Sequence, residues 1–189
     1  MAHDISAHDI TGKTVAFLLT DGYEDSELTE PWKAVTEAGG TAVLVSPAGA
    51  SVEGKKGHSQ SVDQPVSQAD ADDFDALMLP GGVVNADHLR MDTDAVAFTR
   101  AFFEQHKPVG VICHGAWILI EADVVKGREL TSYPSLRTDL LNAGAEWVDE
   151  EVVVDAGLVS SRTPDDLPAF CAKLVEEVDE GEHAGQTAP

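Results

Sequence analysis

Residues 108–117 read PVGVICHGAW and are the clearest indication of the fold class. Its first part, Pro108–Ile112, is apolar without alternation, which predicts a strand buried on both faces. Cys113-His114-Gly115 follows as a tight turn, and Ala116–Ala122 has the character of a short helix. A strand of this kind that leads directly into a helix is typical of a parallel sheet covered by helices.

The same alternation of short apolar runs and amphipathic segments extends in both directions. Other predicted strands are Lys13–Thr20, Thr41–Ser46 and Asp75–Leu79, with a possible minor strand in SVDQPV. Predicted helices are Ser26–Ala38, Thr93–Gln105, Ser135–Ala143 and Pro164–Val178. A β-hairpin is predicted from Glu151–Asp155 and Leu158–Ser161 across Ala156-Gly157. The sequence therefore predicts an α/β fold with a doubly wound parallel sheet and a small β-hairpin.

One domain accounts for the folded chain, because no composition shift interrupts the pattern. The polar ends predict a flexible N-terminal tail over residues 1–11 and a flexible C-terminal tail over residues 179–189, with the α/β domain over residues 12–178. In such sheets the binding crevice lies at the carboxyl ends of the strands. We therefore expect function in the loops after the first, third and fourth of these strands.

The charge balance excludes some classes of partner. The chain has 189 residues, 34 acidic against 12 basic, and a formal net charge of −22. Nucleic acids and anionic membranes attract Lys and Arg, so neither is an expected partner. No apolar run approaches a membrane span and the N-terminus lacks a signal peptide, so a cytoplasmic location is expected. The acidic surface suggests a halophilic protein, although an ordinary acidic protein is the alternative.

The two cysteines differ in their surroundings. Cys171 lies within PAFCAKLVEEV and is expected on the inner face of the last helix. Neither Cys171 nor Cys113 belongs to a metal-spaced set, and the chain has no glycine-rich phosphate loop. The sequence therefore gives no support for a metal or an organic cofactor.

Cys113 stands where a predicted strand turns sharply into a helix, the arrangement of a nucleophile elbow. A helix N-terminus favours thiolate over thiol, so we expect a lowered pKa and a reactive sulfur. Gly115 would let the chain turn tightly and keep the thiol open. The alternative interpretation is an inert cysteine buried at a strand end.

Several side chains are candidates for assisting that sulfur. His114 could take its proton, and Glu24, one of four acids in the first loop, could donate a hydrogen bond to it if protonated. The amides near Gly81 and Gly82 could form an oxyanion hole with that of His114. Asp87 could orient His114, and Tyr133 could line a pocket. Each has a plainer alternative as a turn, core or solvated surface residue.

These motifs, taken together, resemble the PfpI/ThiJ family. The resemblance covers Lys13 to Val178 and is carried by six segments in order: Tyr23–Leu28, Leu79–Gly82, Val111–Gly115, Thr131–Pro134, Asn142–Asp149 and Glu151–Asp155. It implies a flavodoxin-like fold of the class I glutamine amidotransferase-like superfamily.

The resemblance also implies roles for individual residues. Cys113 matches the family's nucleophile, Glu24 the glutamate that hydrogen-bonds the thiol, His114 the histidine of a Cys-His-acid set, and Tyr133 a pocket tyrosine. Asp87 is the best match for the acid, although the archetype has glutamate and one residue fewer before it. In protease-like members that acid comes from the neighbouring subunit. Members form dimers, or hexamers built from dimers, so a homo-oligomer is expected.

The activities implied by the resemblance share one chemical core, attack of a thiolate on a carbonyl. They are those of a cysteine peptidase, a deglycase acting on glycated adducts, and a cofactor-independent glyoxalase acting on small carbonyl compounds. We therefore expect a cysteine-dependent hydrolase or stress-protection enzyme. The alternative is a non-catalytic redox-sensing or chaperone-like stress protein, since an accessible thiol beside a carboxyl group can be oxidised selectively.

Overall fold

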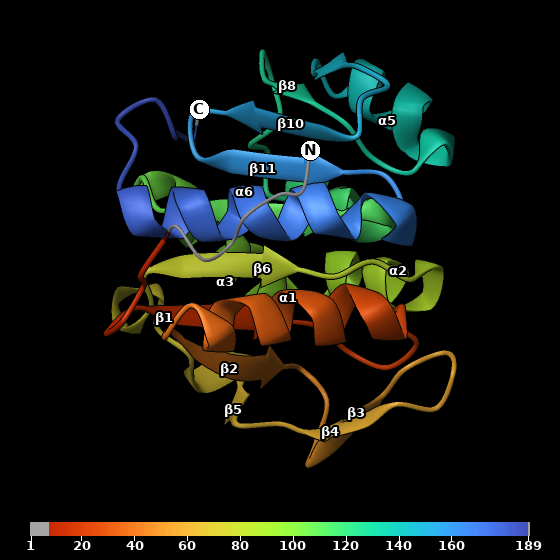
Figure 1. Ribbon diagram of the computed structural model, residues 1–189. Helices are drawn as coiled ribbons and strands as arrows, with labels where there is room; N and C mark the ends of the chain where they lie inside the picture. The colour runs from red at the N-terminus through yellow and green to blue at the C-terminus, as the bar shows by residue number, and fades with distance from the viewer. Residues whose placement is uncertain (1–7, 189) are drawn as a thin grey trace.

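The computed structural model describes residues 8–188 and contains one seven-stranded sheet (Figure 1). The strand order is β10-β11-β7-β6-β1-β2-β5, and every pair is parallel except β10 with β11. The strands are β1 (Thr14–Leu18), β2 (Thr41–Ser46), β5 (Gln64–Pro65), β6 (Ala76–Leu79), β7 (Val109–Ile112), β10 (Val152–Asp155) and β11 (Leu158–Ser161). The predicted doubly wound, flavodoxin-like α/β fold is confirmed.

Helices cover both faces of this sheet (Figure 1). On one face lie α1 (Asp25–Glu37) and α6 (Leu167–Glu180), and on the other α2 (Val83–Met91), α3 (Thr93–Glu104) and α4 (Trp117–Glu121). Successive strand residues point to opposite faces, so β1 sends Ala16 and Leu18 into the α3 layer and Val15 and Phe17 into the α1 layer. This double burial explains why the strands are apolar throughout.

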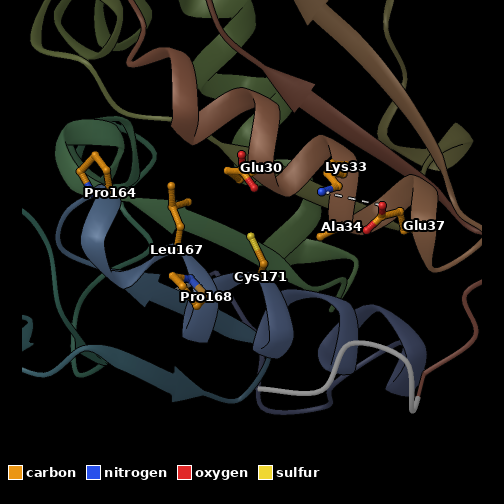
Figure 2. Close-up of a pocket in the computed structure, with 8 residues that line it drawn as sticks. All are labelled: Glu30, Lys33, Ala34, Glu37, Pro164, Leu167, Pro168 and Cys171. Carbon is orange, nitrogen blue, oxygen red and sulfur yellow. Dashed lines mark ion pairs between the residues drawn. The ribbon is translucent and has the colours of Figure 1, made fainter. Parts of the chain in front are cut away.

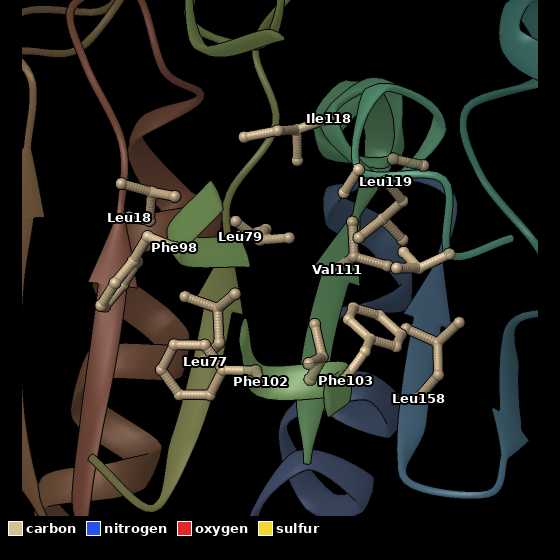
Figure 3. Packing of buried hydrophobic residues seen from close by; sticks show 14 of the residues in the cluster. Leu18, Leu77, Leu79, Phe98, Phe102, Phe103, Val111, Ile118, Leu119 and Leu158 are labelled. Carbon is tan, nitrogen blue, oxygen red and sulfur yellow. The ribbon is translucent and has the colours of Figure 1, made fainter. Parts of the chain in front are cut away.

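The α3 face is packed mainly by aromatic and aliphatic side chains (Figure 3). Phe102 and Phe103 are 0% exposed and lie over Leu77 and Val111 of the sheet. Each side chain of this size contributes about 1.5–3 kcal/mol when fully buried. This layer holds β7 in place, and β7 in turn fixes the position of Cys113.

Smaller elements complete the chain. They are the hairpin of β3 (Ser51–Glu53) and β4 (Ser59–Ser61), the short parallel pair β8 (Glu129–Leu130) and β9 (Glu146–Trp147), α5 (Arg137–Asn142), and single 3-10 turns at Val66–Gln68, Ala71–Asp73, Cys113–Ala116, Pro134–Leu136 and Pro164–Asp166. Helix α2 is absent from the predicted helices, because VVNADHLRM has no clear apolar stripe and follows two glycines. The predicted hairpin forms, and its second strand joins the main sheet beside β7.

Packing against the domain continues beyond its expected boundaries, residues 12 and 178, at both ends of the chain. Ile10 is 1% exposed and its N–H donates to the carbonyl of Ala38 at 3.0 Å. At the other end α6 continues to Glu180, and Gln186 is 0% exposed with Nε2 donating to the Lys107 carbonyl at 3.1 Å. Residues 1–7 and 189 of the expected tails lie outside the described residues, and the flexibility of both tails stays a prediction. Among residues 8–188, no helix is long and apolar enough to span a bilayer.

Candidate active site

Cys113 occupies a sharp turn between β7 and the 3-10 turn that precedes α4. Its backbone φ is +62°, a left-handed conformation that costs a non-glycine residue about 1–3 kcal/mol. The predicted elbow is therefore present, with the strain in the cysteine itself. Gly115 is needed for a different reason from the one expected: a Cβ there would lie 2.7 Å from the carbonyl oxygen of Leu79.

Glu27, on the inner face of α1, is the carboxylate that meets the Cys113 thiol. Its side chain is 0% exposed, and Oε2 accepts a hydrogen bond from the Gly81 N–H at 2.8 Å. The second oxygen, Oε1, is buried without a hydrogen-bond partner among the described residues. An orphan carboxylate oxygen in a dry site favours the protonated form of the acid.

The Glu27 carboxyl and the Cys113 thiol perturb each other. Burial raises the pKa of Glu27 to about 7, against the opposing effect of the Gly81 N–H. Burial, followed by the nearby charge of Glu27, raises the pKa of the Cys113 thiol to about 12, although the N–H groups of His114 and Gly82 oppose that rise. This direction is opposite to the expected one, because the helix N-terminus is outweighed by burial and by a carboxylate.

Glu24 is not placed as the sequence analysis expected. It precedes α1, and its carboxylate forms ion pairs with Lys55 and with Lys56, the latter at 2.6 Å. Burial would raise the pKa of Glu24, but the two ammonium groups outweigh burial and lower it. An ionised carboxylate held by two lysines has no proton to donate to sulfur. The contact expected of Glu24 is therefore made by Glu27, one helical turn later.

His114 lies directly against the thiol. Its Nδ1 is 3.2 Å from the Cys113 sulfur, and its Nε2 is 3.3 Å from the hydroxyl oxygen of Ser135. Tyr133 stacks on the imidazole with ring centroids 4.6 Å apart, so the tyrosine expected at the pocket is brought to the site. Burial and the charge of Lys55 lower the pKa of His114. The imidazole is therefore neutral at neutral pH and can accept or donate a proton.

The two glycines after β6 pack closely against Cys113 and the first loop. A Cβ at Gly81 would lie 2.7 Å from the Cys113 Cβ, and one at Gly82, where φ is +88°, would lie 2.4 Å from the Gly22 carbonyl oxygen. The N–H of Gly81 is already donated to Glu27, so it is not free for a substrate oxygen. The amides of Gly82 and His114 both point toward the sulfur. Two of the three expected oxyanion donors therefore remain available.

Asp87 is not brought to His114 within one chain. It lies exposed on α2, and the described residues show no hydrogen bond or ion pair between the two side chains. Ser135 occupies the Nε2 side of the imidazole instead. Of the predicted site residues, those brought together are thus Cys113, His114, Gly81, Gly82 and Tyr133.

Glu27 and Ser135 were missed as site residues by the sequence analysis. The position of Glu27 on the helix could have identified it as a site residue. Leu28, Pro31 and Val35 mark the buried face of α1, and Glu27 is the acid that shares that face. Ser135 follows Tyr133 in a turn whose direction the sequence does not encode. No group of three or more metal-ligating side chains gathers at Cys113 in the described part of the chain.

Cys171 lies elsewhere, at a pocket between α1 and α6 (Figure 2). The pocket has a volume of about 380 Å³ and is lined by Glu30, Lys33, Ala34, Glu37, Pro164, Leu167, Pro168 and Cys171. Cys171 is 4% exposed and packs in the α1 layer, as expected for a core residue. Burial, and then the charge of Glu30, raise the pKa of its thiol to about 12.

The sequence of this chain is similar to those of several named proteins. It is 49% identical over 161 residues to "Protein/nucleic acid deglycase 2" of Escherichia coli, covering 84% of this chain and 93% of the relative. It is 49% identical over 162 residues to "General stress protein 18" of Bacillus subtilis, covering 84% and 94%. It is 43% identical over 162 residues to "Deglycase PfpI" of Pyrococcus furiosus, covering 86% and 97%.

Solved structures agree with this relationship. A two-domain protein from Anabaena variabilis with DJ-1/ThiJ/PfpI-like and ferritin-like domains superposes with a TM-score of 0.85 and 34% identity, over 88% of this chain and 48% of that one. Drosophila melanogaster DJ-1beta gives a TM-score of 0.82 and 27% identity, over 88% and 90%. Residues 13–177 match the sequence pattern of the DJ-1/PfpI family. This chain therefore belongs to the DJ-1/PfpI family.

Proposed function

We propose that the chain is a cysteine-dependent enzyme that acts on small carbonyl compounds and on the glycated adducts that they form with amines or thiols. The observation that carries this proposal is a single one: the Cys113 thiol lies between a buried carboxyl group, Glu27, and a neutral imidazole, His114. The deglycase names of close relatives support the same substrate class.

The first step is addition of the Cys113 sulfur to an aldehyde carbon. The sulfur–carbon bond forms as the carbonyl π electrons move to oxygen, and the thiol proton passes to the Glu27 carboxylate. The amides of Gly82 and His114 stabilise the developing oxyanion, which then takes a proton and gives a hemithioacetal. Because Glu27 has a raised pKa of about 7, it can accept and release that proton near neutral pH.

An α-oxoaldehyde then rearranges without any external oxidant. His114 moves a proton from the hemithioacetal carbon to the adjacent carbonyl carbon, and the hydroxyl proton passes to the neighbouring oxygen. The first carbon is thereby oxidised to a thioester and the second is reduced to an alcohol. Water hydrolyses the resulting thioester to a 2-hydroxy acid and restores the thiol. A glycated amine or thiol carries the same fragment as a carbinolamine or hemithioacetal. The Cys113 sulfur displaces its amine or thiol, which leaves with a proton, and the enzyme hemithioacetal that forms then rearranges and is hydrolysed as above, so that the adduct is repaired and the Cys113 thiol is restored.

The assay compares the parent chain with Cys113→Ala and with the control Cys171→Ala. Loss of methylglyoxal, release of amine from a glycated amino acid, and hydrolysis of a peptide are each measured. We expect Cys113→Ala to lose at least about a thousandfold in the first two assays and Cys171→Ala to keep the parent rate. Equal rates in all three proteins would contradict the proposal, and loss of peptide hydrolysis alone would favour a peptidase.

A homo-oligomer in which a second copy supplies Asp87 to the site is part of this proposal. Asp87 is exposed on α2, and Val83 and Val84 on the same helix are 53% and 51% exposed. Exposed apolar residues beside an active site suit a subunit contact. A neighbouring copy packed on α2 would bring an acid toward the edge where Ser135 meets His114.

A redox-sensing role is the second candidate, favoured by the two amides that point at the sulfur. Those N–H groups, with a protonated Glu27, could hydrogen-bond the oxygens of a sulfinate. Peroxide treatment followed by mass spectrometry tests it. Oxidation of Cys113 no faster than that of Cys171 would count against this role.

A further inference from the structure

Three side chains capable of binding a metal gather at the C-terminal end of α6, at the opposite end of the sheet from Cys113. They are Glu177, Glu180 and His183, and one ligand atom from each lies within 4.8 Å of the others. This is the only group of three or more such side chains in residues 8–188. Glu177 and Glu180 are three residues apart on the helix and share one face. The chain then turns at Gly181, where φ is +84°, and His183 comes back toward that face.

The inner part of this cluster contains groups without the partners that burial requires. Glu177 is 6% exposed, and in the described chain its carboxylate has no hydrogen bond to a residue outside the cluster. His183 Nε2 is buried without a hydrogen-bond partner, although it lies 3.2 Å from Glu177 Oε2. The two atoms are close but are not aligned for a hydrogen bond. Buried polar atoms left in this state are costly and point to a missing partner.

The 3.2 Å separation between His183 Nε2 and Glu177 Oε2 suits two ligands of one metal ion. Ligand atoms at about 2.0–2.1 Å from a tetrahedral zinc ion lie about 3.3 Å apart. The imidazole is also held in place from outside the cluster. The backbone N–H of His183 donates to the His106 carbonyl at 2.8 Å, and the ring packs against Gly157, where a Cβ would lie 2.8 Å from His183 Cδ2. The ring is therefore positioned before any ion binds.

We propose that Glu177, Glu180 and His183 bind one divalent first-row transition metal ion. Two carboxylates and one imidazole are the donor set of Zn²⁺ and its neighbours, whereas Ca²⁺ and Mg²⁺ prefer oxygen ligands alone. A dication would balance the two glutamates, in a chain whose formal net charge is −22. It would also lie at a helix C-terminus, where positive charge is favourable.

The ion would fasten the C-terminal segment to the domain. Beyond His183, the Thr187 carbonyl accepts a hydrogen bond from Arg128 at 2.9 Å, and Gln186 is buried. These contacts hold the segment beside the β10–β11 turn, and a metal bridge from α6 to His183 would add to them. This proposal does not depend on the chemistry proposed for Cys113.

The test uses the full chain freed of metal by a chelator. Isothermal titration with Zn²⁺ is expected to give one tight site, and Co²⁺ is expected to give visible absorption from a low-coordinate N/O site. His183→Ala and Glu177→Gln should each weaken Zn²⁺ binding at least about tenfold. The matched control is Glu176→Gln, because Glu176 pairs with Lys173 outside the cluster and should bind Zn²⁺ as the parent does.

Thermal melting in the presence of chelator checks that each variant folds, and added Zn²⁺ should raise the Tm of the parent and of Glu176→Gln only. If Glu177→Gln fails to fold, His183→Ala decides the question. The proposal is wrong if the parent binds no Zn²⁺, or if its tight site survives in His183→Ala. Competition by millimolar Mg²⁺ would also contradict the proposed donor set. Methylglyoxal turnover should be the same with and without Zn²⁺, so failure here is distinct from failure of the proposed enzyme.

Discussion

Cys113 and Cys171 are buried to a similar extent but have very different neighbours. They are 8% and 4% exposed, and burial raises the pKa of each thiol to about 12. Cys171 has ordinary helical backbone and lines an open pocket with Glu30, whereas Cys113 has a φ of +62°, a buried acid and an imidazole. Burial and a raised pKa therefore do not separate a reactive thiol from an inert one. What separates them is a group that can take the proton at the moment of attack.

The largest effect on activity should come from removing the Glu27 carboxylate, the group that takes the thiol proton. Glu27→Gln keeps the size of the side chain and an acceptor for the Gly81 N–H, but it cannot accept the thiol proton. We expect turnover of methylglyoxal to fall about a hundredfold or more. Glu24→Gln, one helical turn away, is the matched control and should cost less than about tenfold, because its carboxylate pairs with Lys55 and Lys56, whose side chains are 51% and 66% exposed, and not with the sulfur. Equal losses in the two variants would return Glu24 to the role first expected of it.

A second effect concerns stability, because the acid that serves Cys113 is costly to bury. Burial raises the pKa of Glu27 from 4.5 to about 7, so the folded chain holds this proton between those pH values and the unfolded chain does not. Stability from this group is therefore complete below about pH 4.5 and is lost as pH rises toward 7. Glu27→Gln should be more stable than the parent by about 2–3 kcal/mol at pH 8 and nearly equal at pH 4.5. Urea unfolding at both pH values measures this, and a variant less stable at pH 8 would refute it.

The smallest expected effect is that of salt on stability, which acts through the acidic surface and is the same for variants at either cysteine. With a formal net charge of −22, salt should screen repulsion between carboxylates and stabilise the fold. We expect a gain of about 1 kcal/mol, or about 2–4 °C in Tm, between low and molar salt. Because screening acts on the whole surface, Cys113→Ala and Cys171→Ala should gain as much as the parent. A Tm independent of salt would remove the halophilic interpretation.

The fold was predictable because its signal is local and repeated. Strand β2, predicted over Thr41–Ser46, has those bounds in the structure, and the elbow at Cys113 follows from a buried strand that leads into a helix. The helix α2 was not predictable, because its buried residues Asn85, Ala86 and Leu89 give a weak apolar pattern. Its start is set instead by Gly82 packed against Gly22.

The site was only partly predictable, because its carboxylates lie close together in the sequence. Glu24 and Glu27 both stand near the start of α1, and a small change in helical phase decides which of them faces the thiol. The partners that fix Glu24 as an ion pair, Lys55 and Lys56, come from the turn of the β3–β4 hairpin, about thirty residues away. No local pattern predicts that this hairpin lies over the first loop, where the Gly22 N–H donates to the Glu53 carbonyl. The sign of the Cys113 pKa shift was not predictable either, because it depends on the burial of the thiol and on the charge of Glu27.

The most direct test is the pH dependence of alkylation at the two cysteines in one sample. Iodoacetamide labelling, quantified for each cysteine by mass spectrometry, gives two rate profiles under identical conditions. The rate at Cys113 should rise through the pKa of Glu27, near pH 7, and then stay level until the pH approaches 12, whereas Cys171 should react slowly over that whole range. In Glu27→Gln the step near pH 7 should vanish. Parallel profiles for the two cysteines, or a step that survives in Glu27→Gln, would contradict the role given to the buried acid.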